Sequence, residues 1–226
     1  MGNIHRLIAF DLDGTLIDSR RDLADAANDL IAELGGRPLA EAAVATMVGE
    51  GATLLVRRAL MAAGLAEPPD AVPRFLAFYD VRLLNYTRLY PGVVDVVRLA
   101  GEHARVAVLT NKPKDPTERI LEGLGIRDLF DDVTGGDGPL PRKPDPAGLF
   151  ALMGSAGSGP QTTLLVGDSP IDFRTARNAG TRCCLVSFGF GFRNFAEGEP
   201  DANASIAADV GQLADIIRAF ALSPVQ

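Results

Sequence analysis

Two aspartates that follow a short apolar stretch are the first candidates for chemistry in this sequence. The stretch LIAF at 7–10 reads as a buried strand, and Asp11, Asp13, Gly14 and Thr15 come directly after it. Side chains two residues apart on an extended backbone point the same way, so these carboxylates repel each other unless a cation lies between them. A magnesium ion meets that requirement, and an incoming phosphoryl group would also fit there.

Matching polar residues follow three later stretches of the chain. They are found in VAVLTNKP at 106–113, PRKPDP at 141–146 and TLLVGDSPID at 163–172. In order, they are a threonine, a lysine and two aspartates: Thr110, Lys143, Asp168 and Asp172. If each lies at or beyond the carboxyl end of a parallel strand, all of them meet at one edge of the sheet.

The elements that must position these residues can be read from the periodicity. After the first motif, apolar residues recur at intervals of three and four, which predicts a helix with Asp18 or Ser19 as N-cap and Gly35 at its end. Helical patterns continue to Arg88 without a strand candidate. Because this stretch is too long for a βα connection, we expect residues 18–88 to form an all-helical cap domain.

From residue 89 onward, strand and helix patterns alternate. The helix around 115–125 carries strong start signals, with Asp115 as the expected N-cap and Glu118 placed to complete a capping box. Alternating strands and helices predict an α/β fold with a doubly wound parallel sheet, a Rossmann-like core formed by residues 1–17 and 89–226. The ligand site of such a sheet lies at the carboxyl ends of its strands.

Composition excludes several classes of function. The 226 residues carry a formal net charge of −7, which argues against a nucleic-acid partner. The sequence has neither a secretory signal nor an apolar run long enough to span a membrane, so we expect a cytoplasmic protein with no membrane partner. His5 and His103 are isolated, which removes Ser-His and zinc chemistry. Cys183 and Cys184 read as reduced core thiols on opposite faces of a strand, with a redox pair as the alternative.

Together the motifs resemble those of the haloacid dehalogenase-like hydrolase superfamily, which are an Asp-x-Asp pair, a Thr or Ser, a Lys, and a late Gly-Asp with a second acid. FDLDGTLIDS, VGEGA, TNKP and GDSPIDFRTARNAG look most like its phosphoglycolate phosphatase branch. The resemblance implies that Asp11 is the nucleophile and Asp13 the general acid/base. Dehalogenases of the superfamily lack an acid at the second position, so the resemblance implies a phosphatase.

The resemblance also implies roles for the remaining motif residues. Thr110 and the backbone of Asn111 would bind a phosphoryl oxygen, and Lys143 would offset the charge on the nucleophile and the phosphate. Mg²⁺ would be held by Asp11, Asp168 and the backbone carbonyl of Asp13, an oxygen set that suits this cation. Asp172 would hold metal-bound water or orient Lys143, or else simply favour the start of the following helix.

Residues of the expected cap are candidates for substrate binding. Glu50 in VGEGA stands where the branch commonly has Asn, and its carboxylate would disfavour an anionic leaving group such as glycolate. Arg57 and Arg58 could receive a substrate carboxylate or form a solvated face. The stretch 189–195, GFGFRNF, either borders the active site or is a plain loop. Lys112 and Lys114 match no motif position and read as surface charges.

The sequence therefore predicts a magnesium-dependent phosphatase that hydrolyses a small phosphate monoester, with 2-phosphoglycolate favoured, through an aspartyl-phosphate. The alternatives are a β-phosphoglucomutase-like mutase, a sugar-phosphate or pyrophosphate phosphatase, and an inactive binding protein on the same scaffold. The expected partner is a small phosphate ester, and the protein is expected to be a monomer or a homodimer.

Overall fold

The computed structural model describes residues 5–202 and 204–223, and its centre is a parallel sheet with strand order β5-β4-β1-β6-β7-β8. In chain order these strands are β1 (Leu7–Phe10), β4 (Arg105–Leu109), β5 (Asp132–Thr134), β6 (Thr163–Gly167), β7 (Arg182–Val186) and β8 (Ala204–Ala207). Every neighbouring pair is parallel. The predicted doubly wound sheet is confirmed.

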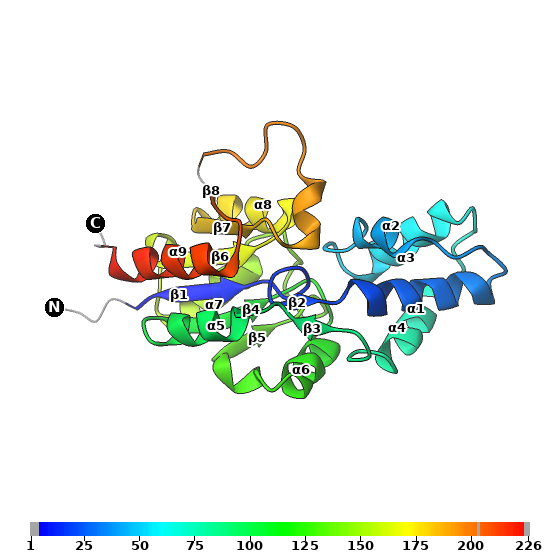
Figure 1. Ribbon diagram of the computed structural model, residues 1–226, viewed down its shortest axis with the longest axis horizontal. Coiled ribbons are helices and arrows are strands. Elements are labelled where there is room, and N and C mark those ends of the chain that lie inside the picture. The colour runs from blue at the N-terminus through cyan, green and yellow to red at the C-terminus, as the bar shows by residue number, and fades with distance from the viewer. Residues whose placement is uncertain (1–4, 203, 224–226) are drawn as a thin grey trace.

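Helices cover both faces of this sheet (Figure 1). One face packs against α5 (Val93–Gly101), α6 (Lys114–Gly123) and α9 (Val210–Leu222), and the other against α7 (Ala147–Ala156) and α8 (Pro170–Ala179). Short 3-10 helices η1 (Arg127–Leu129), η2 (Pro160–Thr162) and η3 (Phe190–Asn194) lie in the connections. Cys183 and Cys184 are free, buried and divided between the two apolar clusters, as their alternation predicted.

A helical insert lies to one side of the sheet, beyond the carboxyl end of β1 (Figure 1). It consists of α1 (Arg20–Glu33), α2 (Glu41–Ala45), α3 (Ala52–Ala62) and α4 (Ala71–Asp80). Gly35 follows α1 with φ +80°, a left-handed conformation that ends a helix at little cost for glycine. No helix of the described residues is both long and apolar enough to cross a membrane.

Where the chain enters and leaves the insert, it forms a short antiparallel pair that the sequence did not indicate. β2 (Ile17–Asp18) pairs with β3 (Arg88–Leu89). Two crossings that run side by side can satisfy each other's backbone groups in this way. The predicted domain boundaries fall within these two strands, and the division into core and cap at those positions stays a prediction.

At the starts of two helices, the capping in the structure differs from the sequence prediction. Ser19 is the N-cap residue of α1 by position, but no side chain caps the helix there, because the Ser19 hydroxyl donates to Asp13 Oδ1 at 2.6 Å. The helix α6 begins at Lys114 with Pro113 at the N-cap, so the prediction of Asp115 as N-cap is wrong. The proline fixes an extended backbone immediately before the helix, and Asp115 lies in the first turn instead.

The site is positioned by the order of the strands. The chain runs from β1 to β4 and β5 on one side, and later to β6, β7 and β8 on the other. β1 is therefore flanked by β4 and β6, and the connections beyond their carboxyl ends diverge to leave a crevice. Asp11, Thr110 and Asp168 each follow one of these three strands directly.

Candidate active site

A buried lysine joins two of the predicted site aspartates. Lys143 Nζ lies 2.8 Å from Asp11 Oδ1 and 2.6 Å from Asp172 Oδ1, and its side chain is 3% exposed. Burial alone would lower the pKa of Lys143, but the charges of Asp11 and Asp172 raise it above the ordinary value. The lysine therefore remains a cation and holds the Asp11 carboxylate in place.

Asp172 is fixed by the start of α8. While its Oδ1 accepts from Lys143, its Oδ2 accepts from the Ser169 hydroxyl at 2.6 Å and from the backbone N–H of Ser169 at 3.1 Å and of Asp168 at 3.3 Å. Ser169 and Asp172 form a capping box. Because both oxygens of Asp172 are already engaged, its position suits orienting Lys143 better than binding a metal ion directly.

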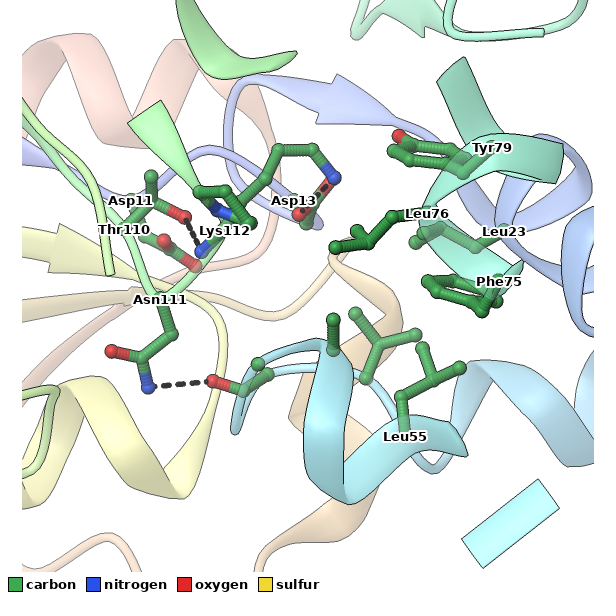
Figure 2. A pocket seen from close by; sticks show the side chains of 15 residues that line it. Asp11, Asp13, Leu23, Leu55, Phe75, Leu76, Tyr79, Thr110, Asn111 and Lys112 are labelled. Carbon is green, nitrogen blue, oxygen red and sulfur yellow. Dashed lines mark hydrogen bonds and ion pairs between the residues drawn. The ribbon is translucent and has the colours of Figure 1, made fainter. Parts of the chain in front are cut away.

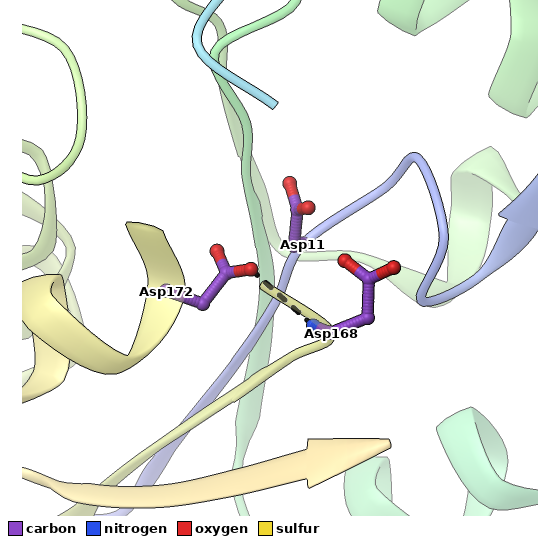
Figure 3. Close-up of side chains that lie close together, drawn as sticks. All are labelled: Asp11, Asp168 and Asp172. Carbon is purple, nitrogen blue, oxygen red and sulfur yellow. Dashed lines mark hydrogen bonds between the residues drawn. The ribbon is translucent and has the colours of Figure 1, made fainter. Parts of the chain in front are cut away.

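Three carboxylates gather at the carboxyl ends of β1 and β6 (Figure 3). Asp11, Asp168 and Asp172 each offer an oxygen within 4.8 Å of the others, and all three residues are buried. Burial raises the pKa of Asp11 to about 7 although Lys143 opposes the rise, and burial together with Asp172 and Asp11 raises the pKa of Asp168 well above its usual value. The single charge of Lys143 does not balance three carboxylates, so the cluster fits a hard divalent cation.

Two glycines allow the backbone to lie close to the Asp168 carboxylate. Gly14 has φ +87°, and a Cβ at this position would lie 1.9 Å from Asp168 Oδ2. Gly191 in η3 donates its backbone N–H to the same oxygen at 2.7 Å. Of the two alternatives for the stretch 189–195, the structure supports the one in which it borders the site.

Asp13 is held by two donors. The Ser19 hydroxyl contacts its Oδ1 at 2.6 Å, and Lys112 Nζ lies 2.9 Å from its Oδ2. Lys112 is only 7% exposed, so the prediction that it is a surface charge is wrong. Burial alone would lower the pKa of Lys112, but Asp13 raises it above the ordinary value. Lys112 is thus a buried cation directly beside the expected general acid/base.

Thr110 and Asn111 are buried at the carboxyl end of β4. The Asn111 side-chain amide donates to the carbonyls of Gly49 and Lys143, each at 2.9 Å. It therefore links the loop before α3 to the loop that carries Lys143. The Thr110 hydroxyl accepts from the backbone N–H of Lys112 at 3.2 Å.

Residues at the carboxyl ends of β1 and β4 form one end of a pocket of about 490 Å³, part of it open to solvent, between the sheet and the insert (Figure 2). Its polar lining comes from the strand ends: Asp11, Asp13, Thr110, Asn111 and Lys112. Its apolar lining comes mainly from the insert: Leu23, Val48, Ala52, Leu55, Phe75, Leu76 and the ring of Tyr79. One end of the pocket is therefore polar and carries the candidate catalytic residues, whereas the side formed by the insert is apolar.

The substrate-binding residues expected on the insert have other partners. Glu50 forms an ion pair with Arg58. Arg57 lies 3.1 Å from Glu67, with 59% of its side chain exposed. Gly49 and Gly51 line the pocket, whereas Glu50 and Arg57 are not among its lining residues.

An acidic cluster at the switch point of a doubly wound sheet, joined to a buried lysine and faced by a helical insert, defines a haloacid dehalogenase-like α/β hydrolase. Residues 8–186 match the model of the haloacid dehalogenase-like hydrolase family. The chain belongs to this family, as its motifs predicted.

Similar proteins narrow the position within the family. The chain is 46% identical over 194 residues to a phosphoglycolate phosphatase of Rhodospirillum rubrum, an alignment covering 82% of this chain and 80% of that protein. It is 41% identical over 196 residues to a phosphoglycolate phosphatase of Pseudomonas putida, covering 84% and 72%. The crystal structure of a predicted phosphoglycolate phosphatase from Haemophilus somnus matches with a TM-score of 0.84 at 34% identity, covering 95% of this chain and 97% of that one.

Proposed function

We propose that this protein is a magnesium-dependent phosphatase that hydrolyses 2-phosphoglycolate through an aspartyl-phosphate on Asp11. The observation that carries the proposal is the buried contact of Lys143 with Asp11, next to a second carboxylate, Asp13. A structural aspartate at a strand end needs neither a buried lysine nor a pocket in front of it. The names of the similar proteins support 2-phosphoglycolate as the substrate.

Asp11 and Asp13 divide the reaction into two steps. The Asp11 carboxylate attacks phosphorus and forms a new P–O bond while the ester P–O bond breaks. Asp13 gives its proton to the departing alkoxide. Asp13, now ionised, then takes a proton from a water molecule that attacks the phosphorus, and this releases phosphate and regenerates Asp11.

Other residues of the site hold the reacting groups and balance charge. Lys143 faces the nucleophile, so it reduces the repulsion between the Asp11 carboxylate and an anionic phosphate. Thr110 and the backbone of Asn111 lie at the neighbouring strand end and would donate to a phosphoryl oxygen. Asp172 fixes Lys143 through its contact at 2.6 Å.

Asp11, Asp168 and the backbone carbonyl of Asp13 would hold Mg²⁺. When bound, the ion would neutralise charge shared between the nucleophile and the phosphoryl group. The Gly191 N–H occupies one oxygen of Asp168. The other oxygen would therefore be the candidate ligand.

The insert limits the size of the substrate, and the two cysteines bear on the cellular compartment. A cap over the strand ends restricts the pocket to small esters and limits bulk water around the reacting groups.

The free, buried Cys183 and Cys184 suit a reducing cytoplasm. A measurement of mass in solution decides between a monomer and a homodimer.

A panel assay tests the proposal. Phosphate release is measured with 2-phosphoglycolate, sugar phosphates, nucleoside monophosphates and pyrophosphate, each with Mg²⁺ and with excess chelator. We expect the highest kcat/KM for 2-phosphoglycolate and loss of activity on chelation. Full activity in chelator would refute the metal requirement, and a higher kcat/KM for a sugar phosphate would refute the substrate.

A further inference from the structure

Lys112 is the only cation among the described residues that line the pocket, and the reaction above gives it no role. Its ammonium group lies 2.9 Å from Asp13 Oδ2 and 4.6 Å from the centre of the Tyr79 ring (Figure 2). Asp13 follows β1 in the sheet, whereas Tyr79 belongs to α4 of the insert. Lys112 therefore lies where the two parts of the molecule face each other, at the polar end of the pocket.

Tyr79 supplies a second sign of a ligand. The residue is 3% exposed, and its hydroxyl makes no hydrogen bond of normal geometry within residues 5–202 and 204–223, although Lys112 lies close enough to oppose the rise of its pKa. A buried hydroxyl without a partner is costly unless a ligand or water satisfies it. Burial raises the pKa of Tyr79 to about 12, so the hydroxyl keeps its proton and can donate to an anion.

We propose that Lys112 and Tyr79 together bind the carboxylate of the leaving group and make the enzyme selective for phosphate esters of short hydroxy acids. This inference rests on the proposed function, which places the phosphoryl group at Asp11 and the ester oxygen at Asp13. An acid that protonates the ester oxygen lies within hydrogen-bond reach of it. Because Lys112 already contacts Asp13, a carboxylate one methylene beyond that oxygen comes within reach of the same ammonium group.

The rest of the lining limits the length and polarity of the leaving group. Beyond Lys112 and Tyr79 the insert presents apolar side chains: Leu23, Leu55, Phe75 and Leu76. The hydroxyl groups of a sugar placed against this wall would lose water without gaining partners. A short leaving group with a single carboxylate satisfies the limits on length and on polarity. Its charged end lies at Lys112, and it places no hydroxyl groups against the apolar side chains.

The two insert arginines that the sequence suggested as carboxylate ligands, Arg57 and Arg58, do not compete for this role. Arg58 is paired with Glu50, and Arg57 with Glu67. The Glu50 carboxylate, which would otherwise repel an anionic leaving group, is likewise neutralised by Arg58. Lys112 loses its contact with Asp13 when it turns to the substrate, and the Ser19 hydroxyl still holds Asp13 at 2.6 Å.

The test compares two substrates that differ only at the far end. 2-Phosphoglycolate carries a carboxylate where 2-hydroxyethyl phosphate carries a neutral hydroxymethyl group. For Lys112→Met, we expect the ratio of kcat/KM between these esters to fall by about ten- to a hundredfold, since one charge-assisted contact is lost. For Tyr79→Phe, which removes only the hydroxyl, we expect a fall of about threefold to tenfold.

Binding of stable analogues supplies a readout that does not depend on turnover. Calorimetry would measure Kd for 3-phosphonopropionate and for 3-hydroxypropylphosphonate, which replace the ester oxygen by a methylene. The Kd ratio should change in parallel with the kcat/KM ratio. Lys114→Met, at an exposed neighbouring lysine, is the matched control and should leave both ratios unchanged, and circular dichroism would verify that each variant is folded.

The outcomes separate this inference from the proposed function. A wild-type protein without phosphatase activity would refute the proposed function, while the Kd ratio would still test Lys112 and Tyr79. If Lys112→Met weakens both phosphonates equally, the lysine does not bind the carboxylate and the inference is wrong. An unchanged ratio in Tyr79→Phe would remove the hydroxyl from the site.

Discussion

The buried aspartates predict that the metal-free protein loses stability as the pH rises. The pKa of Asp11 is raised from 3.8 to about 7, so between these pH values the folded state binds more protons than the unfolded state. Stability therefore falls across this window. For Asp11 alone, the difference in pKa corresponds to a loss on the order of 4 kcal/mol. The raised pKa of Asp168 acts in the same direction.

Magnesium should reverse this loss, because it binds the ionised carboxylates of the folded protein. A ligand present at a hundred times its Kd stabilises by about 2.7 kcal/mol, which for a chain of this size raises Tm by roughly 5–10 °C. We expect a shift of this order at pH 8 and little shift at pH 5, where Asp11, with a pKa of about 7, holds its proton.

Thermal unfolding followed by circular dichroism suits this chain, which has no tryptophan. Asp168→Asn should abolish the Mg²⁺ response, whereas Glu122→Gln, at an exposed position, should leave it intact. An equal rise in Tm at pH 5 and pH 8, or none at pH 8, would contradict the account of the carboxylate cluster.

Three further substitutions test other parts of the site. Lys143→Met leaves the buried acids without their lysine and should lower the free energy of unfolding of the metal-free protein by about 3 kcal/mol at pH 8, measured in urea. Gly14→Ala should weaken Mg²⁺ binding at least about tenfold by calorimetry, since the new Cβ would lie 1.9 Å from Asp168 Oδ2. Glu50→Asn should change the preference for 2-phosphoglycolate over 2-hydroxyethyl phosphate by less than about threefold, because the Glu50 charge is already paired on the insert; a tenfold change in kcat/KM would contradict this.

The gathering of the motif residues at one edge could be predicted because it depends on topology rather than on side-chain detail. Asp11, Thr110 and Asp168 each follow an apolar strand, and alternation with helices makes those strands parallel. The carboxyl ends of such strands meet whatever the sequence between them. The helical insert could be predicted equally well, since its periodicity is clear and its length excludes a simple connection.

The buried position of Lys112 could not be predicted in the same way. Its ion-pair partner Asp13 lies 99 residues away in the chain, and Tyr79 belongs to a helix with no motif. Burial of a lysine is decided by such distant contacts, whereas a lysine read alone is expected at the surface. The available signal was its position two residues after Thr110, at the end of a buried strand.

The starts of two helices could not be predicted from local hydrogen-bond rules alone. Ser19 is a good N-cap residue, but its hydroxyl donates to Asp13 instead. Its location beside the crossing into the insert brings it close to a carboxylate, which is a stronger acceptor than the available alternatives. The start of α6 is decided locally instead, because Pro113 fixes an extended backbone before Lys114 and leaves Asp115 in the first turn.

The most direct test of the central claim is to trap the phosphoryl group on Asp11. Asp13→Asn should still accept phosphate from p-nitrophenyl phosphate, whose leaving group needs no proton, but should release it slowly for want of a base. After an acid quench in the presence of Mg²⁺, mass spectrometry should find one phosphoryl group on the peptide that contains Asp11. The double variant Asp11→Asn/Asp13→Asn should carry none, and a phosphoryl group on another residue, or turnover by a folded Asp11→Asn at the wild-type rate, would contradict the account.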